Sequence, residues 1–141
     1  MPYATLQDLE TRYGADEINQ LTDRDNDGNN DPDVVDSALN SASSEMDSYL
    51  GVRYSTPIAT VSDNLNRVCC DIARFLLHDD AATDEVEARY NRAIKWLQAI
   101  ASGKAVLTDD NGAEIGSNRL TKGVRYDSSE RYFTDKSMAS Y

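Results

Sequence analysis

Three stretches of the chain repeat apolar residues at the spacing of an amphipathic α-helix. In the first stretch, Asp31 is expected to cap a helix that has Pro32 at its first position and Gly51 after its end. One face of this helix collects its apolar side chains, namely Val35, Ala38, Leu39, Ala42, Met46, Tyr49 and Leu50. The pattern predicts a helix of about 19 residues that packs on a hydrophobic core.

The second and third stretches predict two more long helices. One is expected to begin at Thr60 or Ser62 and to end near Leu77, with an inward face made of Leu65, Val68, Cys69, Ile72, Ala73 and Leu76. The other begins at Thr83 and ends at Gly103, with a core face made of Val86, Tyr90, Ala93, Ile94, Leu97 and Ile100. Trp96 lies off this face, and packing between helices is favoured over contact with another subunit.

Two shorter helices are expected before the long ones. Thr5 with Asp8 resembles a capping arrangement, and the helix that follows stops at Gly14. Asp16 is expected to cap a second short helix. The fold class is therefore all-α: a small helical bundle of three long and one or two short helices, with a single core in residues 1–103.

Residues 104–141 break the helical pattern and predict an extended C-terminal arm. Residues 105–107 form a short strand-like run, and residues 109–112 indicate a turn. The last sixteen residues nevertheless hold large apolar side chains, namely Tyr126, Tyr132, Phe133, Met138 and Tyr141. Such residues are typical of a segment that docks into a groove on a partner, although a functionless end is the alternative.

An acidic loop with carboxylates on alternate residues precedes the first long helix. Asp23, Asp25 and Asp27 are followed by Gly28, and a further carboxylate lies at Asp31. In the first half of a calcium loop, oxygens on alternate residues wrap the ion and a glycine allows a sharp turn. The sequence therefore predicts a Ca²⁺ site in residues 23–36.

The predicted calcium loop is incomplete at its end. Its twelfth position, where a bidentate glutamate normally closes the site, is Val34. Asp33 and Asp36 are the nearest carboxylates, and water is another way to complete the shell. The candidate metal ligands are Asp23, Asp25, Asp27, Asn29 (through its carbonyl), Asp31 and Asp36. The alternative is a solvated acidic turn that binds no ion.

Charge and composition narrow the possible partners. The net charge is −11, and residues 1–50 hold 12 acidic against 2 basic side chains. Without a basic cluster, sequence-specific binding of nucleic acid is not expected. No segment is long and apolar enough for a membrane span, and no signal sequence is expected. Cys69 and Cys70 are adjacent within a helical pattern, which favours buried reduced thiols and synthesis in the cytoplasm.

The sequence offers little chemistry for catalysis. It contains no glycine-rich phosphate loop, no Gly-x-Ser-x-Gly, no His-Glu-x-x-His and no Cys-x-x-Cys. Its one histidine, His78, falls at a predicted helix end, where contact with the helix C-terminus and solvent is expected. We therefore expect no enzymatic activity; a small hydrolase using carboxylates would need helix-borne acids to converge in a pocket.

Five blocks of the sequence can be compared with known families: residues 1–14 (MPYATLQDLETRYG), 20–25 (QLTDRD), 41–50 (SASSEMDSYL), 70–77 (CDIARFLL) and 131–138 (RYFTDKSM). In this order, they resemble the Mu-type head-to-tail connector family of tailed phages and prophages. The resemblance implies a virion structural protein: a small helical adaptor that assembles as a ring under the portal protein and meets a tail or stopper protein. Cation binding is not implied by it, so the calcium prediction rests on spacing alone.

A monomeric, calcium-dependent protein-binding module is the main alternative to a ring subunit. The acidic loop fits both interpretations, and so does the apolar C-terminal arm. The two differ in oligomeric state and in binding to a portal protein.

Overall fold

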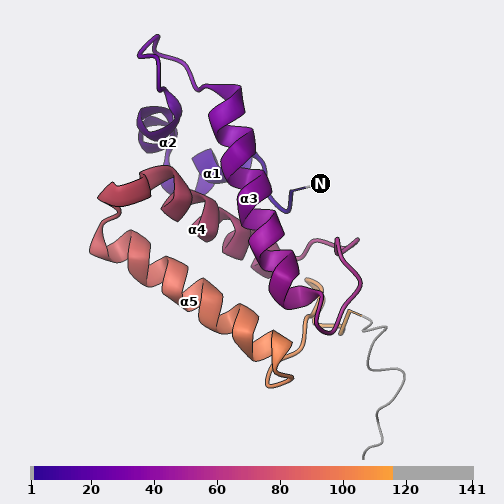
Figure 1. Cartoon of the computed structure of the whole chain (residues 1–141). Coiled ribbons are helices and arrows are strands. Elements are labelled where there is room, and N and C mark those ends of the chain that lie inside the picture. Colours follow the sequence, from indigo (N-terminus) through magenta and orange to yellow (C-terminus); the bar gives the residue numbers. More distant parts are fainter. Residues whose placement is uncertain (1, 116–141) are drawn as a thin grey trace, which may run out of the picture.

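Helices make up most of the structure, a computed structural model that describes residues 2–115. The elements are α1 (Leu6–Tyr13), α2 (Ala15–Thr22), α3 (Pro32–Leu50), α4 (Asp63–His78), the short 3₁₀ helix η1 (Asp79–Ala81) and α5 (Asp84–Ala101) (Figure 1). Within residues 2–115 there is no strand, and the only β pairing is an isolated bridge between Thr108 and Glu114. The all-α prediction is confirmed, with three long and two short α-helices.

Local capping explains where most helices begin. The capping box of Thr5 and Asp8 at α1 is present, and the predicted caps Ser62 and Thr83 accept hydrogen bonds from the backbone of α4 and α5. One capping prediction is wrong, and another is confirmed in position but not in its hydrogen bond. Asp16 lies inside α2, which begins after Gly14. Asp31 stands at the start of α3 without a capping hydrogen bond, because its carboxylate accepts from the Arg24 N–H instead.

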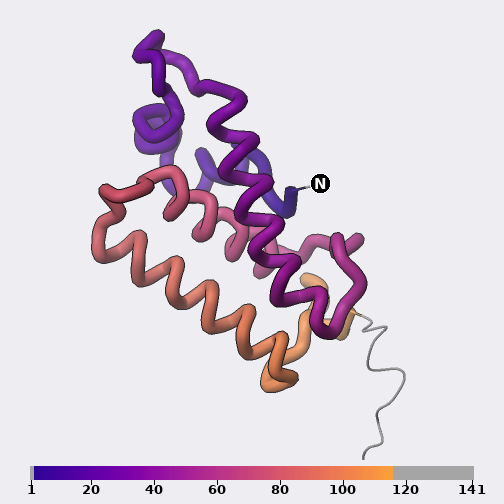
Figure 2. The backbone as a smooth tube through the Cα atoms, in the orientation of Figure 1, coloured from indigo at the N-terminus to yellow at the C-terminus, as the bar shows by residue number. Residues whose placement is uncertain are grey.

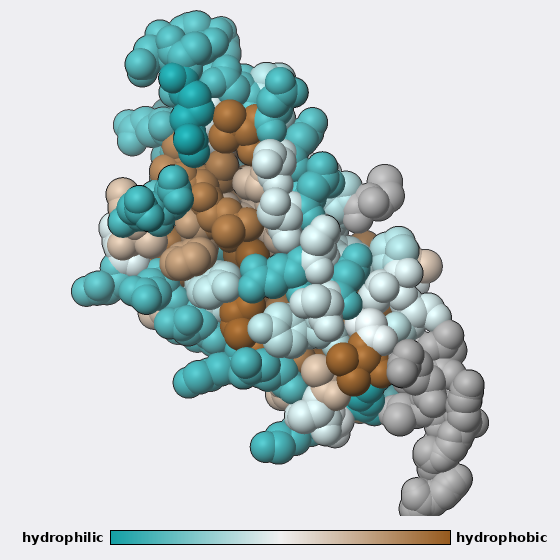
Figure 3. Space-filling model, viewed as in Figure 1, coloured by the Kyte–Doolittle hydropathy of each residue, from teal (hydrophilic) through white to brown (hydrophobic). Residues whose placement is uncertain are grey.

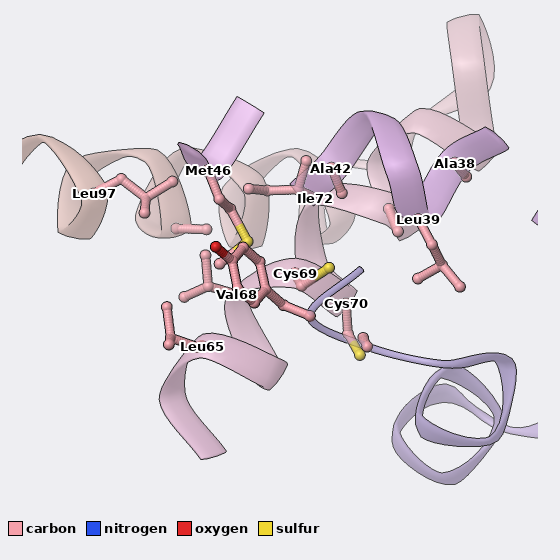
Figure 4. Close-up of a cluster of buried hydrophobic side chains, with 14 of the residues drawn as sticks. Ala38, Leu39, Ala42, Met46, Leu65, Val68, Cys69, Cys70, Ile72 and Leu97 are labelled. Atoms are coloured by element: carbon pink, nitrogen blue, oxygen red, sulfur yellow. The ribbon is translucent and has the colours of Figure 1, made fainter. Parts of the chain in front are cut away.

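Helix α4 is the centre of the fold. It packs against each of the other four α-helices, with α3 crossing it, α5 running alongside it, and α1 and α2 beside it (Figures 1 and 2). Figure 4 shows how side chains from α3, α4 and α5 meet in one cluster, which includes Ala42, Met46, Leu65, Val68, Cys69, Ile72 and Leu97. Burial of these side chains is the main stabilising contribution to the fold.

Of two sequence predictions about this core, one is confirmed and one is wrong. Trp96 is partly buried against the core, as predicted. Leu76 was expected to face inward, but it is 37 % exposed because it lies on the solvent side of the last turn of α4. Cys69 and Cys70 are free and buried, in agreement with the expectation of reduced thiols.

The N-terminal segment and residues 51–62 are joined through Tyr3. Its backbone N–H donates to Ser43 Oγ at 3.0 Å, and its hydroxyl donates to Asp47. The same hydroxyl accepts from the Ile58 N–H at 2.9 Å. One buried side chain thereby ties the start of the chain to α3 and to the connection that follows it.

Residues 104–115 pack on the helical body rather than leaving it. Leu107 is fully buried, and its N–H donates to the hydroxyl of Tyr54 at 3.0 Å. A turn at Asp109 then brings the chain back, so that the Ile115 N–H donates to the Leu107 carbonyl at 2.8 Å. The turn was predicted, whereas the strand-like run at 105–107 forms no strand. The boundary drawn at residue 103 is not a break in packing, and the rest of the arm, 116–141, lies outside the described residues.

Candidate functional site

The acidic loop between α2 and α3 is folded around its own carboxylates. Asp23 accepts from the backbone N–H groups of Asp27 and Gly28 at 3.0 and 2.9 Å, and Asp27 accepts from the N–H of Asn29 at 2.8 Å. Gly28 has a φ of 88°, which glycine adopts without steric cost. The predicted sharp turn is therefore present where the sequence placed it.

The structure brings four of the predicted ligands together. Asp23, Asp25, Asp27 and Asp31 each place one carboxylate oxygen within 4.8 Å of the other three. A Ca²⁺ ion with oxygen ligands at about 2.3–2.6 Å separates opposite oxygens by about 4.6–5.2 Å. The spacing of the four carboxylates therefore fits a calcium ion held between them.

Of the other two predicted ligands, Asp36 is not part of this group of carboxylates. Asn29 lies in the loop and would contribute only its carbonyl. Asp36 is exposed on α3 and lines a separate hollow with Pro2, Ala4 and Leu6. Among the described residues, the cluster of four carboxylates therefore contains no counterpart of the usual closing glutamate.

Crowding of like charges is visible in the loop's acid–base properties. Partial desolvation raises the pKa of Asp25, and the hydrogen bond with Asp23 and the charges of Asp27 and Asp31 add to the effect. Desolvation also acts on Asp23, but the N–H groups of Gly28 and Asp27 outweigh it and lower the pKa of that carboxyl. A divalent cation would relieve the repulsion among these groups.

The loop is held to the helices at its ends. The Asp31 N–H donates to the carbonyl of Thr22 at 3.0 Å, and the buried Thr22 hydroxyl contacts Asn30 Oδ1 at 2.8 Å. The Asn30 amide in turn donates to Glu10 on α1 at 3.3 Å. These bonds fix both ends of the loop, so the carboxylates are gathered by the fold as well as by local turns.

A partly buried ion pair between α2 and α4 was not predicted from the sequence. Arg74 of α4 donates two hydrogen bonds to Glu17 of α2, at 2.6 and 3.0 Å, and its guanidinium lies 4.3 Å from the centre of the Tyr13 ring. His78 was expected to face solvent, but its Nε2 is buried 3.5 Å from Glu17 Oε2. The available signal was that Arg74 follows Cys70 by four residues, on the buried side of α4.

The pKa of Glu17 reflects this pairing. The hydrogen bonds from Arg74 lower the pKa of the Glu17 carboxyl, against the desolvation that opposes ionisation, and the positive charge of Arg74 acts in the same direction. Arg74 itself is 10 % exposed, so its charge depends on this partner. The pair therefore holds α2, and with it one end of the acidic loop, against α4.

An apolar groove lies on the same end of the molecule, between the first half of α3 and the last turn of α4. Figure 3 shows the band of hydrophobic surface that runs along this side of α3. The groove has a volume of about 450 Å³ and is lined by Arg24, Asp33, Val34, Ser37, Ala38, Ser41, Leu76 and Leu77. Apolar surface exposed in this way is typical of a site that binds another protein segment.

No helix in the described part of the chain is both long and apolar enough to cross a membrane. The fold and its surface features thus define a small all-α protein with an acidic loop and an exposed apolar groove at one end.

Comparison with known proteins assigns this helical protein to a family. The family model described as bacteriophage Mu Gp36 matches residues 3–124, and the chain belongs to this family of Mu-type phage proteins. The chain is 36 % identical over 105 residues to gene product J of Escherichia phage Mu, covering 74 % of each protein. It is 38 % identical over 111 residues to the Mu-like prophage FluMu protein gp36 of Haemophilus influenzae, covering 77 % of this chain and 79 % of that protein. The family predicted from sequence resemblance is confirmed.

Proposed function

We propose that this chain is a virion structural protein that acts as a head-to-tail connector, a subunit of an adaptor ring between the portal protein and a tail or stopper protein. The observation that carries the proposal is membership of the Mu Gp36 family over residues 3–124. The five sequence blocks that resemble Mu-type connectors support the same role. The proposed role is architectural and involves no catalysis.

The shape of the body supports a role in which unlike surfaces meet. The acidic loop and the apolar groove lie at the N-terminal end of α3. The segment 104–115 packs beside Tyr54, just beyond the other end of that helix. A ring closed by rotation requires one surface of each subunit to bind a different surface of the next. The two ends of this protein offer such different surfaces.

The charge of the protein suits a position near passing DNA. The net charge is −11, and residues 1–50 carry most of it. Negative surfaces repel the phosphate backbone, so a ring of such subunits would let the genome pass without binding it. A basic lumen in the assembled ring would contradict this part of the proposal.

Assembly with the portal protein is the direct test. We expect the full chain to co-purify with the portal protein of its own phage and to form rings on it that electron microscopy resolves. Mass photometry of the chain alone over a wide concentration range gives its free oligomeric state. A protein that stays monomeric beside its portal, and binds another protein only with calcium, would favour the alternative of a calcium-dependent binding module.

Calcium binding by the acidic loop is a separate part of the proposal, supported by the mutual spacing of four carboxylates. Because the usual closing glutamate is missing, we expect a dissociation constant on the order of 10⁻⁴ M, as in weak extracellular sites. Isothermal titration in calcium-free buffer would measure it. Asp27→Asn should weaken binding at least tenfold, while Asp84→Asn, at the exposed start of α5, should leave it unchanged.

Asp36 can be tested in the same titration. Weaker calcium binding by Asp36→Asn would identify Asp36 as the residue that closes the site. Unchanged binding would mean that water and the carbonyl of Asn29 complete the ligand shell of the ion instead. Equal heats for the wild type and Asp27→Asn would contradict the calcium site altogether.

A further inference from the structure

The groove between α3 and α4 exposes apolar side chains that other parts of the described body leave uncovered. Leu76 is 37 % exposed on one wall, and Val34 and Ala38 of α3 form the other. Two serines and two charged residues also line the groove. An apolar floor with a polar rim is the usual anatomy of a site for a peptide segment that carries hydrophobic anchors.

The surroundings of the groove are strongly acidic. Residues 16–36 hold eight acidic side chains and one basic side chain, Arg24. Asp33 lines the groove, and the exposed Asp79 and Asp80 directly follow α4. A segment that binds here should therefore combine apolar anchors with positive charge.

The C-terminal segment, residues 116–141, has this composition. It holds five basic and three acidic side chains, a net charge of +2, so the remaining residues 1–115, with nine basic and 22 acidic, have a net charge of −13. Its first ten residues include Arg119, Lys122 and Arg125 and no acid. Its last sixteen carry the apolar anchors, namely Tyr126, Tyr132, Phe133, Met138 and Tyr141.

The segment starts at the opposite end of the body from the groove. Ile115 is bonded to Leu107, which is bonded to Tyr54 just beyond the end of α3, whereas the groove lies along the first half of α3 (Figures 1 and 2). The offset along the helix between Ala38 and its end is about 18 Å at 1.5 Å per residue. Twenty-six residues can span up to about 85 Å when extended, so a groove on a neighbouring subunit is within reach.

We infer that residues 116–141 of one copy bind in the α3–α4 groove of a second copy, with the aromatic residues in the apolar floor and the basic residues against the acidic rim. Because the donor segment and the acceptor groove lie at opposite ends of each copy, every subunit can give and receive one such contact. This contact is heterologous, because it joins two different surfaces, and its repetition from copy to copy builds a ring or a filament. The inference deepens the proposed ring function and rests on it.

Isotope-coded cross-linking of the full chain tests the contact. A photoreactive benzoylphenylalanine replaces Leu76, and copies labelled with ¹⁴N and ¹⁵N are mixed before irradiation. We expect cross-links from position 76 to peptides of residues 126–141. When the two labelled populations are equimolar and their subunits have exchanged fully, about half of these cross-links should join differently labelled chains. The matched control places the probe at Val61, which is 42 % exposed and precedes the other end of α4.

Three results would overturn the inference. The first is cross-links that join only chains of the same label, which would mean that each segment binds its own subunit. The second is equal capture of residues 126–141 from position 61. The third is a probe at position 76 that captures the portal protein instead when the two are mixed.

Complementary variants give a second test that does not use the probe. Leu76→Glu damages the groove and keeps the C-terminal segment, whereas Tyr132→Ala with Phe133→Ala damages the segment and keeps the groove. Each variant alone should lose self-association at least tenfold, and their mixture should form a one-to-one complex by mass photometry. Val61→Glu should associate like the wild type.

The outcomes separate this inference from the proposed function. Rings that form on the portal without the 76 to 126–141 cross-link would reject the inference and keep the connector role. A chain that neither self-associates nor binds the portal would reject the connector role itself. A mixture of the complementary variants that gives no complex, although the wild type associates, would also reject the inference.

Discussion

The ion pair between Arg74 and Glu17 allows a quantitative prediction about the stability of the fold. Arg74→Met keeps most of the apolar stem of the side chain and removes the guanidinium. Two charged hydrogen bonds, at 2.6 and 3.0 Å, and the contact with the Tyr13 ring are lost together. Arg74 and Glu17 come from different helices, so the change loosens the attachment of α2 to α4.

The expected cost follows from how well water can replace the lost partner. Breaking a fully buried pair costs about 3–5 kcal/mol, because the remaining charge is left without compensation. Glu17 is 32 % exposed, so water solvates part of its carboxylate after the substitution. Including the ring contact, worth about 0.5–1 kcal/mol, we expect a loss of about 2–3 kcal/mol in the free energy of unfolding.

Urea unfolding followed by circular dichroism measures this loss. With a slope of about 1.7 kcal/mol per molar, the midpoint should fall by about 1.5 M. The matched control is Arg89→Met, which removes an exposed pair with Glu85 at 3.3 Å on α5. Exposed pairs of this kind contribute only about 0.3–0.5 kcal/mol. A loss for Arg74→Met no larger than that for Arg89→Met would refute the reasoning.

The pH dependence of the same variant gives a second check. The pKa of Glu17 in the folded protein lies below its ordinary value of 4.5, so the pair stabilises the fold fully above that pH. This stabilisation is lost as the pH falls through the pKa of the folded state. The difference between wild type and Arg74→Met should therefore be constant from pH 6 to 7, about 1.5 to 2.5 pH units above 4.5, and should narrow as the pH falls below 4.5. A difference that does not change with pH would contradict the assigned role of Glu17.

Other substitutions and probes test the core. Tyr54→Phe removes the acceptor of the buried Leu107 N–H, and urea titration should show a loss of about 1–2 kcal/mol in the free energy of unfolding. An unchanged midpoint would argue against the packing of residues 104–115. Burial raises the pKa of Cys70 to about 12. Iodoacetamide at pH 8 should therefore modify this thiol much faster in unfolded than in native protein, which mass spectrometry would show. Equal rates of modification would contradict the burial of Cys70. Leu97→Ala should cost about 3–5 kcal/mol in the same titration, and a cost below about 1 kcal/mol would place Leu97 outside a packed core.

Sequence periodicity predicted the helices well, because helix formation and capping depend on residues only three or four positions apart. The bounds of α3, from Pro32 to Leu50, agree with the predicted helix of about 19 residues; the caps Thr5 and Thr83 were predicted, and Ser62 was one of two predicted starts of α4. The cap predicted at Asp16 is wrong, and Asp31 stands at the N-cap position of α3 without a capping hydrogen bond. A short acidic side chain has several backbone N–H groups within reach, and the spacing alone does not decide which of them it accepts from.

The sequence by itself determined the helical class, the acidic loop with its alternating carboxylates, and the Mu-type family. Only the tertiary structure decided that Arg74 meets Glu17 across 57 positions, that Leu76 faces outward beside α3, and that Leu107 belongs to the core. The physical reason is that a periodic pattern tells which residues share a face of a helix. Which neighbour covers that face, and which part of it is left open for another molecule, depends on how all the helices pack together.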